Sequence, residues 1–239
     1  MAPEAAEHRR RRSDALAQFV RARCRLCPVP LVPEIRLHLA DEAFTLWEAI
    51  ERESGEPSQP PPFWAFAWPG GQALARYLLD RPGTVAGRTV LDLGAGSGLA
   101  AIAAARAGAA AVLASEVDPL ASAAIALNAN ANGAKVEVTG DVLDGDGENA
   151  QVVLAGDVWY ERGLAERAIR LLRQARDRGA EIFVGDIGRA FLPRSLLSEL
   201  AAYDVPVVAE LEDAAVKRAL IMTLLPPARQ SGTGGVTEA

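Results

Sequence analysis

The sequence predicts an α/β fold in which a mostly parallel β-sheet carries helices on both faces. From residue 89 onward, short apolar runs of strand length alternate with longer amphipathic or alanine-rich segments, which is the pattern of repeated βα units. The first run enters a turn that contains Gly94, Gly96 and Gly98, and the segment after it has high helix propensity. A chain of 239 residues, half of them apolar, is long enough for one substantial core.

We expect five strands, each followed by a helix or turn, and then two closing strands that form a hairpin. The five strands are predicted at residues 89–93, 111–115, 135–139, 152–155 and 181–184. Helices are predicted at 99–108, 119–132, 161–178 and 193–203, and the closing strands at 205–211 and 218–225. A helix also precedes the first strand, because Leu74, Tyr77 and Leu78 recur at helical spacing.

Three regions are expected along the chain. Residues 1–60 form an N-terminal extension, with a helix at 13–23, a proline-rich linker, a strand, a second helix and a flexible loop rich in Pro and Ser. Residues 61–225 form the main domain. The polar, glycine-containing end at 226–239 is predicted to be a disordered tail.

The glycine turn indicates a nucleotide-type cofactor at the first βα unit, because a helix N-terminus opens directly behind it. A dinucleotide fingerprint counted from Gly94 would place its third glycine at position 99, which is Leu99. The strand instead carries Asp92, which would repel a pyrophosphate but suits a cationic amine. This D-x-G-x-G-x-G pattern resembles motif I of the seven-strand S-adenosylmethionine (SAM) methyltransferases. The resemblance implies SAM as the cofactor, with Asp92 near its amino group.

Acidic residues lie at the carboxyl ends of all five strands, where ligands bind in an open parallel sheet. They are Asp92, Glu116, Asp141, Asp157 and Asp186. Asp is also common in turns and helix caps, which would explain one or two of the five. We expect Glu116 to accept the ribose hydroxyls and Asp141 the adenine amino group, with Gly156 beside the cofactor.

The segment after the fourth strand, Asp157-Val158-Trp159-Tyr160, indicates the acceptor. An Asp with Tyr three positions on resembles the D-x-x-Y signature of seven-strand protein-lysine methyltransferases. A lysine amine must be neutral to attack a sulfonium methyl, and deprotonating it at pH 7 costs about 4–5 kcal/mol. A carboxylate can hold the arriving ammonium, and aromatic walls favour the neutral amine by excluding water.

Aromatic residues crowd the segment before the Pro-Gly-Gly turn at 69–71. Trp68 lies at the entry to the next helix, where it could cover the sulfonium or the adenine. Phe63 and Phe66 are expected in the core.

The segments PEIRLHLADEAFTLWEAIE, FWAFAWPGGQALARYLL, VLDLGAGSGL, GDVWYE and GDIGRAFLP occur in this order. Together they resemble the electron-transfer flavoprotein β-subunit lysine methyltransferases over about residues 30–225. The resemblance implies a Rossmann-like seven-strand sheet and SAM-dependent methylation of a protein lysine, on that flavoprotein subunit or a similar protein such as a ribosomal protein. It assigns Asp157 and Tyr160 to the target lysine, with Trp159, Asp186 and Arg189 as further substrate-binding residues. Ile187 departs from the Pro that is common in the family.

Two alternatives remain open: methylation of a small-molecule amine, and a SAM-binding domain without catalysis. The net charge of −6 argues against a nucleic-acid partner, and no apolar run reaches the roughly 18–20 residues of a membrane span. Cys24 and Cys27, with two histidines in the chain, fall short of a zinc site. The arginine- and alanine-rich composition and the missing signal segment lead us to expect a bacterial cytoplasmic protein. The basic N-terminus leaves a mitochondrial location as the alternative.

Overall fold

The computed structural model describes residues 2–56, 58–145, 149–207 and 214–226, so the expected tail lies, beyond Pro226, outside the described residues. A seven-stranded sheet has the order β5-β4-β3-β6-β7-β9-β8. Its parallel part comprises β3 (Thr89–Leu93), β4 (Ala111–Ser115), β5 (Glu137–Thr139), β6 (Val152–Gly156) and β7 (Glu181–Asp186). The final hairpin adds β9 (Val216–Leu224) antiparallel to β7, and β8 (Leu197–Pro206) at the edge. The predicted Rossmann-like sheet is confirmed.

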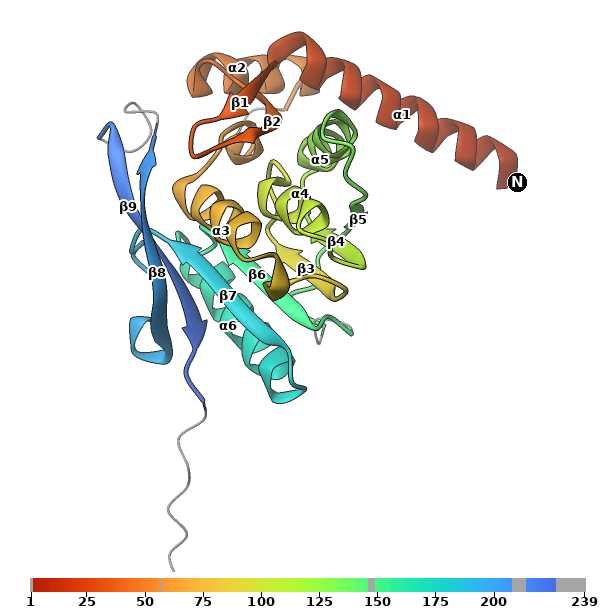
Figure 1. Ribbon diagram of the computed structural model, residues 1–239. Helices are drawn as coiled ribbons and strands as arrows, with labels where there is room; N and C mark the ends of the chain where they lie inside the picture. The colour runs from red at the N-terminus through yellow and green to blue at the C-terminus, as the bar shows by residue number, and fades with distance from the viewer. Residues whose placement is uncertain (1, 57, 146–148, 208–213, 227–239) are drawn as a thin grey trace, which may run out of the picture.

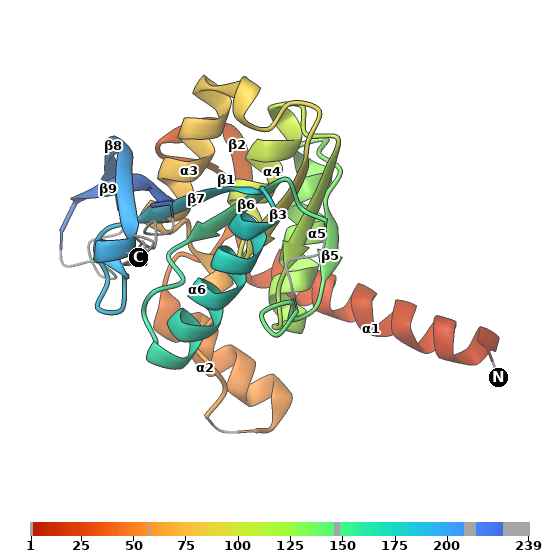
Figure 2. The same ribbon diagram turned by 90° about the horizontal axis from the view of Figure 1, so that it is seen from below.

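Helices cover both faces of this sheet (Figures 1 and 2). α3 (Pro69–Asp80) and α4 (Leu99–Arg106) lie on one face, α6 (Arg162–Asp177) lies on the other, and α5 (Pro119–Ala131) follows β4. Three short 3-10 helices, η1 (Phe63–Ala65), η2 (Pro82–Thr84) and η3 (Arg194–Leu196), complete the helical elements described in the main domain.

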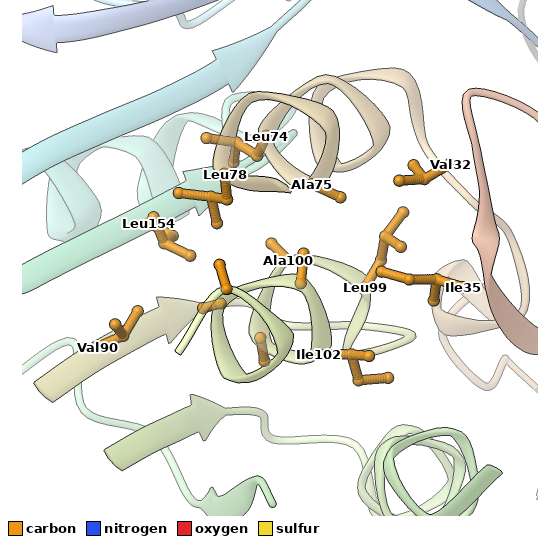
Figure 3. Close-up of a cluster of buried hydrophobic side chains, with 14 of the residues drawn as sticks. Val32, Ile35, Leu74, Ala75, Leu78, Val90, Leu99, Ala100, Ile102 and Leu154 are labelled. Carbon is orange, nitrogen blue, oxygen red and sulfur yellow. The ribbon is translucent and has the colours of Figure 1, made fainter. Parts of the chain in front are cut away.

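The sheet separates two apolar cores, because successive strand residues point to opposite faces. Val90 and Leu154 belong to the cluster beneath α3 and α4 (Figure 3). Leu91 and Val153 belong to the cluster that includes the buried leucines of α6. β3 lies between β4 and β6, so the strand order reverses at its carboxyl end, where such sheets bind ligands.

The N-terminal segment contains α1 (Ala2–Arg23), β1 (Arg25–Val29), β2 (Val32–Leu39) and α2 (Ala43–Ser54). α1 begins at Ala2 rather than at residue 13, and it projects from the body of the molecule (Figure 1). The proline-rich stretch predicted as a linker is instead part of the antiparallel β1–β2 hairpin. Both strands are edges of a two-stranded sheet, where proline costs no essential ladder hydrogen bond.

This hairpin is fixed to the main domain by packing and by side-chain hydrogen bonds. Val32 and Ile35 are fully buried in the same cluster as α3 and α4 (Figure 3). Asn132, which caps the end of α5, accepts from the Arg36 N–H at 2.9 Å and donates to the Arg36 carbonyl at 2.6 Å. Asn128 accepts from the His38 N–H at 2.8 Å. The two amides thus bond to the free edge of β2, while the domain boundary near residue 60 stays a prediction.

The helix predicted at 193–203 is wrong, because these residues form η3 and most of β8. β8 pairs with β9 through a register shift between Glu199 and Ala201. A bulge of this kind breaks the period of two that marks a strand, and Leu200 consequently lies exposed. Among the described residues, no helix combines the length and apolarity needed to cross a membrane.

Candidate active site

A cavity of about 470 Å³ opens at the carboxyl ends of β3, β4 and β6. This volume falls within the range of about 300–1,000 Å³ that is common for small-ligand sites. Most of the predicted site residues line it. They are Trp68, Gly94, Gly96, Glu116, Asp141, Gly156, Asp157, Tyr160 and Arg189.

The glycine turn forms the floor of this cavity. Gly94 has φ 59° and Gly96 has φ 53°, a left-handed conformation that residues with a Cβ rarely adopt. A Cβ on Gly94 would also lie 3.1 Å from Cγ1 of Val158. The Gly96 N–H donates to Oε2 of Glu116 at 2.9 Å, so the turn and the end of β4 are linked directly.

Backbone N–H groups from two segments, the glycine turn and the residues after β4, hold the carboxylate of Glu116. Its Oε1 accepts from the N–H groups of Val117 at 2.7 Å and Asp118 at 3.0 Å. These bonds fix the carboxylate in place. Its Oε2 accepts from the Gly96 N–H and has a second lone pair with which it can accept from a hydroxyl group.

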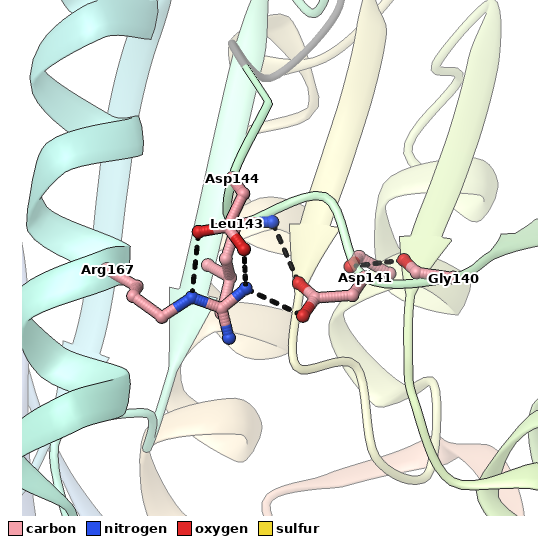
Figure 4. A network of polar contacts seen from close by, with 6 residues as sticks. Gly140, Asp141, Leu143, Asp144 and Arg167 are labelled. Carbon is pink, nitrogen blue, oxygen red and sulfur yellow. Dashed lines mark hydrogen bonds and ion pairs between the residues drawn. The ribbon is translucent and has the colours of Figure 1, made fainter.

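Asp141 belongs to a charged cluster with Asp144 and Arg167 (Figure 4). Its Oδ1 accepts from the Leu143 N–H at 2.9 Å, and its Oδ2 lies 2.7 Å from Nη2 of Arg167, which also bonds Asp144. The hydrogen bond from Arg167 is the main reason that the pKa of Asp141 lies below its usual value. Asp141 therefore stays ionised, and Leu143 lies in the cavity wall beside it.

Asp92 and Gly98 are not among the residues that line the cavity, and their predicted contacts with the cofactor stay predictions. Asp92 is buried, and its Oδ2 accepts from the Ala101 N–H at 3.0 Å in the first turn of α4. Burial raises the pKa of Asp92 to about 7. Gly98 packs against α5, because a Cβ there would lie 3.2 Å from the Ile125 side chain.

Asp186 and Trp159 also lie away from the cavity lining. Oδ1 of Asp186 accepts from the N–H groups of Gly188 at 2.5 Å and Arg189 at 2.7 Å, so this carboxylate shapes the turn after β7. Burial raises its pKa. Trp159 is fully buried in the apolar cluster beneath α6, because the chain turns it inward between the cavity-lining Val158 and Tyr160.

Asp157 occupies the centre of the arrangement. Its φ is 56°, a strained value for a residue other than glycine and one that clusters at functional sites. Oδ2 accepts from the Gly71 N–H at 2.8 Å in the first turn of α3, and the Asp157 N–H donates to the Gly185 carbonyl at 3.0 Å. The partial positive charge of a helix N-terminus stabilises a carboxylate in this position.

The first turn of α3 lies unusually close to the ends of β6 and β7. A Cβ on Gly70 would lie 2.2 Å from the Gly185 carbonyl oxygen, and a Cβ on Gly185 would lie 2.3 Å from the Gly70 oxygen. A Cβ on Gly156 would lie 3.3 Å from the Cα and N atoms of Gly71. The close approach therefore requires glycine at Gly70 and Gly185 and leaves little room for a side chain at Gly156.

Aromatic rings surround the other end of the cavity. Phe63 lies 5.8 Å from Trp68 and 5.3 Å from Tyr160 between ring centroids. Phe63 was expected in the core, but it is 41% exposed and lines the cavity, whereas Phe66 is buried as predicted. Burial is the main cause that raises the pKa of Tyr160, which keeps its hydroxyl protonated at neutral pH.

The geometry fits the predicted SAM. Carboxylates suited to a nucleoside lie beside the glycine turn, and aromatic faces suited to a sulfonium lie next to them. Sequence reasoning missed the Gly71 N–H and the apolar cavity-lining residues Pro61, Leu143 and Leu164. The Pro-Gly-Gly turn was the one signal that could have indicated the Gly71 contact.

The chain is similar to known proteins. The family model of ribosomal protein L11 methyltransferases matches residues 73–166. The electron transfer flavoprotein beta subunit lysine methyltransferase of Danio rerio is 38% identical over 183 residues, covering 74% of this chain and 70% of that protein. Its counterpart in Rattus norvegicus is 40% identical, covering 74% and 71%. A proposed RNA methyltransferase from Pyrococcus horikoshii has a similar fold, with TM-score 0.52, 17% identity, and coverage of 71% of this chain and 91% of that one.

Both of these relatives are vertebrate proteins, which overturns the expectation of a bacterial cytoplasmic protein. The physical reason is that an arginine-rich composition and a missing signal segment identify neither a source nor a compartment.

The extent of these matches settles the cofactor and the class of reaction. The identity exceeds a third over more than two thirds of the zebrafish and rat proteins, and the segment matched by the family model contains the glycine turn and Asp157. The cavity holds carboxylates beside that turn. The chain is a methyltransferase that uses SAM as methyl donor, and it belongs to the electron transfer flavoprotein beta subunit lysine methyltransferase family.

Proposed function

We propose that this protein methylates a lysine side chain of the electron transfer flavoprotein beta subunit. The observation that carries the proposal is the position of Asp157, a carboxylate fixed between the glycine turn and the aromatic end of the same cavity. A cation that enters past the aromatic rings meets this carboxylate next to the methyl donor. The names of the zebrafish and rat relatives supply the acceptor.

On this proposal, each group in the cavity has a distinct task. Asp157 binds the lysine ammonium as it arrives, and Phe63, Trp68 and Tyr160 enclose the aliphatic stem and exclude water. Removal of the proton costs about 4–5 kcal/mol at pH 7 in water, and a water-poor site reduces this cost. Bound SAM supplies an electrophilic methyl group on its sulfonium. Alignment of the amine at roughly 3–3.5 Å from the methyl carbon provides much of the remaining acceleration.

The cofactor assignments follow the same geometry. We assign the ribose hydroxyls to Glu116, the adenine amino group to Asp141, and a position over the sulfonium to Trp68. The backbones of Gly94, Gly96 and Gly156 lie against the cofactor. For four of the expected contact residues, which are not in the cavity lining, we propose a role in holding elements in place: Asp92, Gly98, Trp159 and Asp186.

The test is methyl transfer from labelled SAM to the purified flavoprotein subunit, followed by mass spectrometry to locate the methylated residue. Methyl groups on a lysine support the proposal. Asp157→Asn should abolish this label, whereas Asp177→Asn, which removes an exposed carboxylate paired with Arg176 on α6, should leave it unchanged.

Ribosomal protein L11 is the second acceptor to include, because the family model that matches residues 73–166 is that of its methyltransferases. Label confined to this protein would contradict the flavoprotein assignment. Label found only in small molecules of a cell extract would favour an amine methyltransferase, and SAM binding without label would favour a non-catalytic domain.

A further inference from the structure

Arg189 is the one basic residue among those that line the cavity in the described part of the chain. The acidic residues in the lining are Glu116, Asp118, Asp141, Asp157 and Glu161. The side chain of Arg189 extends from the turn after β7 toward the end of the cavity that Phe63, Trp68 and Tyr160 line. Its Nη2 lies 3.4 Å from Oδ1 of Asp157, and its Cζ lies 5.3 Å from the centroid of the Trp68 ring.

The position of this arginine is fixed from three sides. Asp186 accepts from its backbone N–H at 2.7 Å, Trp68 offers a π face to its guanidinium, and Asp157 offers a carboxylate oxygen. The side chain is 19% exposed. A guanidinium held in this way keeps its charge at any pH at which the protein is folded.

A cation in this place works against simple binding of a lysine ammonium. If Asp157 served only to attract the ammonium, a neighbouring guanidinium would weaken that attraction. The same repulsion favours the uncharged amine, because a nearby like charge disfavours the charged form of a titrating group. An amine next to a second cation is a known way to obtain a reactive neutral lysine.

We propose that Arg189 is a positioning residue that neutralises Asp157 and thereby lowers the pKa of the bound acceptor lysine. This inference rests on the proposed lysine methylation. The ammonium loses its proton to water at the cavity mouth. The nitrogen lone pair then forms the N–C bond while the C–S bond breaks and its electron pair stays on sulfur. The positive charge passes from the sulfonium to the methylated amine, so atoms and charge balance.

The charges that face the acceptor have opposite effects. The five acidic residues of the lining favour the ammonium, Arg189 opposes it, and Tyr160, whose pKa is raised, is neutral. A unit charge roughly 6–8 Å away, at an effective dielectric constant of about 20, shifts a pKa by about one to two units. Loss of Arg189 should therefore raise the pKa of the bound lysine by about that amount.

The experiment measures kcat and KM for the flavoprotein beta subunit at saturating SAM, from about pH 6.5 to 9.5, where kcat rises with deprotonation of the bound amine. Arg189→Gln should move this rise by about one unit or more to higher pH and lower kcat about tenfold at pH 7.5. It should also lower the acceptor KM, because Asp157 is no longer neutralised. Arg189→Lys should restore the wild-type profile, since it keeps the charge.

Arg88→Gln is the matched control. Arg88 pairs with Glu181 at the amino ends of the strands, away from the cavity, so this variant should leave the pH profile unchanged. A kcat for Arg189→Gln that falls equally at every pH would indicate a structural role and overturn the inference. So would Arg189→Lys with a profile shifted as far as that of Arg189→Gln. SAM binding, measured by calorimetry, shows whether each variant is folded. An inactive wild-type enzyme contradicts the proposed function itself, whereas an active one with an unshifted variant contradicts this inference alone.

Discussion

Substitution of Gly70 by alanine should damage both stability and catalysis through the same close contacts of one added carbon atom. The new Cβ would lie 2.2 Å from the Gly185 carbonyl oxygen, 2.6 Å from its carbon and 2.7 Å from Oδ2 of Asp157. Since real Cβ atoms essentially never lie within 3.0 Å of such neighbours, the first turn of α3 must retreat by several tenths of an ångström to roughly 1 Å. Two of these atoms belong to the backbone, which cannot change rotamer. Overpacking of this kind costs about 1–3 kcal/mol.

The same displacement moves the Gly71 N–H away from Asp157. A misplacement of about 1 Å at a reacting centre can lower the rate about 100-fold, and we expect a loss of kcat/KM of this order. Gly71→Ala is the matched control, because a Cβ at that position meets nothing within 4 Å and the N–H is retained. An alanine in the first turn of the helix should add up to about 1 kcal/mol of stability.

The assays are urea unfolding, to obtain the free energy of unfolding, and methyl transfer at a temperature where both variants are folded. The two variants differ by one position in the same helical turn, so differences in expression or helix propensity cannot explain opposite outcomes. Equal unfolding midpoints and equal rates for Gly70→Ala and Gly71→Ala would refute the close-packing argument.

Three further predictions concern buried polar groups. Asp157→Asn should lower acceptor methylation at least about 100-fold and leave the Kd for SAM within about threefold in calorimetry; a large change in that Kd would assign Asp157 to the cofactor. Burial raises the pKa of Asp92 to about 7, against about 3.9 when unfolded, so the folded state binds the extra proton between these values and loses stability as the pH rises from about 4 to 7. Asp92→Asn should therefore weaken the pH dependence of unfolding between about pH 4 and 7, and an unchanged dependence would contradict this. Asn128→Ala should cost about 2–3 kcal/mol in urea unfolding, because it leaves the His38 N–H and the Ser97 carbonyl without their amide partner; a loss below about 1 kcal/mol would show that water replaces it.

The parallel strands and the glycine turn could be predicted because each depends on a local pattern. The predicted strand at 89–93 coincides with β3 (Thr89–Leu93), and its apolar run needs no information from elsewhere in the chain. The N-terminal hairpin could not be predicted in this way. The proline-rich strands of the hairpin are stabilised by Asn128 in α5 and by Asn132 at the end of α5. A local sequence pattern cannot predict a partner that is so distant in sequence.

The direction in which a side chain points at the end of a strand could not be predicted from the sequence either. Spacing correctly places five acidic residues at the carboxyl ends of the strands, yet Asp92 and Asp186 turn back to backbone donors, whereas Glu116, Asp141 and Asp157 line the cavity. All five carboxylates accept from backbone N–H groups, and the segment that supplies the donors differs from one to the next. α4 returns over β3 and offers the Ala101 N–H to Asp92, and the turn after β7 offers two N–H groups to Asp186.

The Gly-Asp pairs at residues 156–157 and 185–186 show why packing and chemistry cannot be separated in this site. Gly156 and Gly185 both lie against the first turn of α3, so the glycines would recur even if neither aspartate contacted a ligand. This approach also brings the Gly71 N–H to Asp157. The Trp-Pro-Gly-Gly turn and the two Gly-Asp pairs therefore form one unit, in which close backbone contact sets the position of the carboxylate. A substitution in that turn, which lies far from Asp157 in sequence, should therefore act on methyl transfer as directly as a substitution next to Asp157.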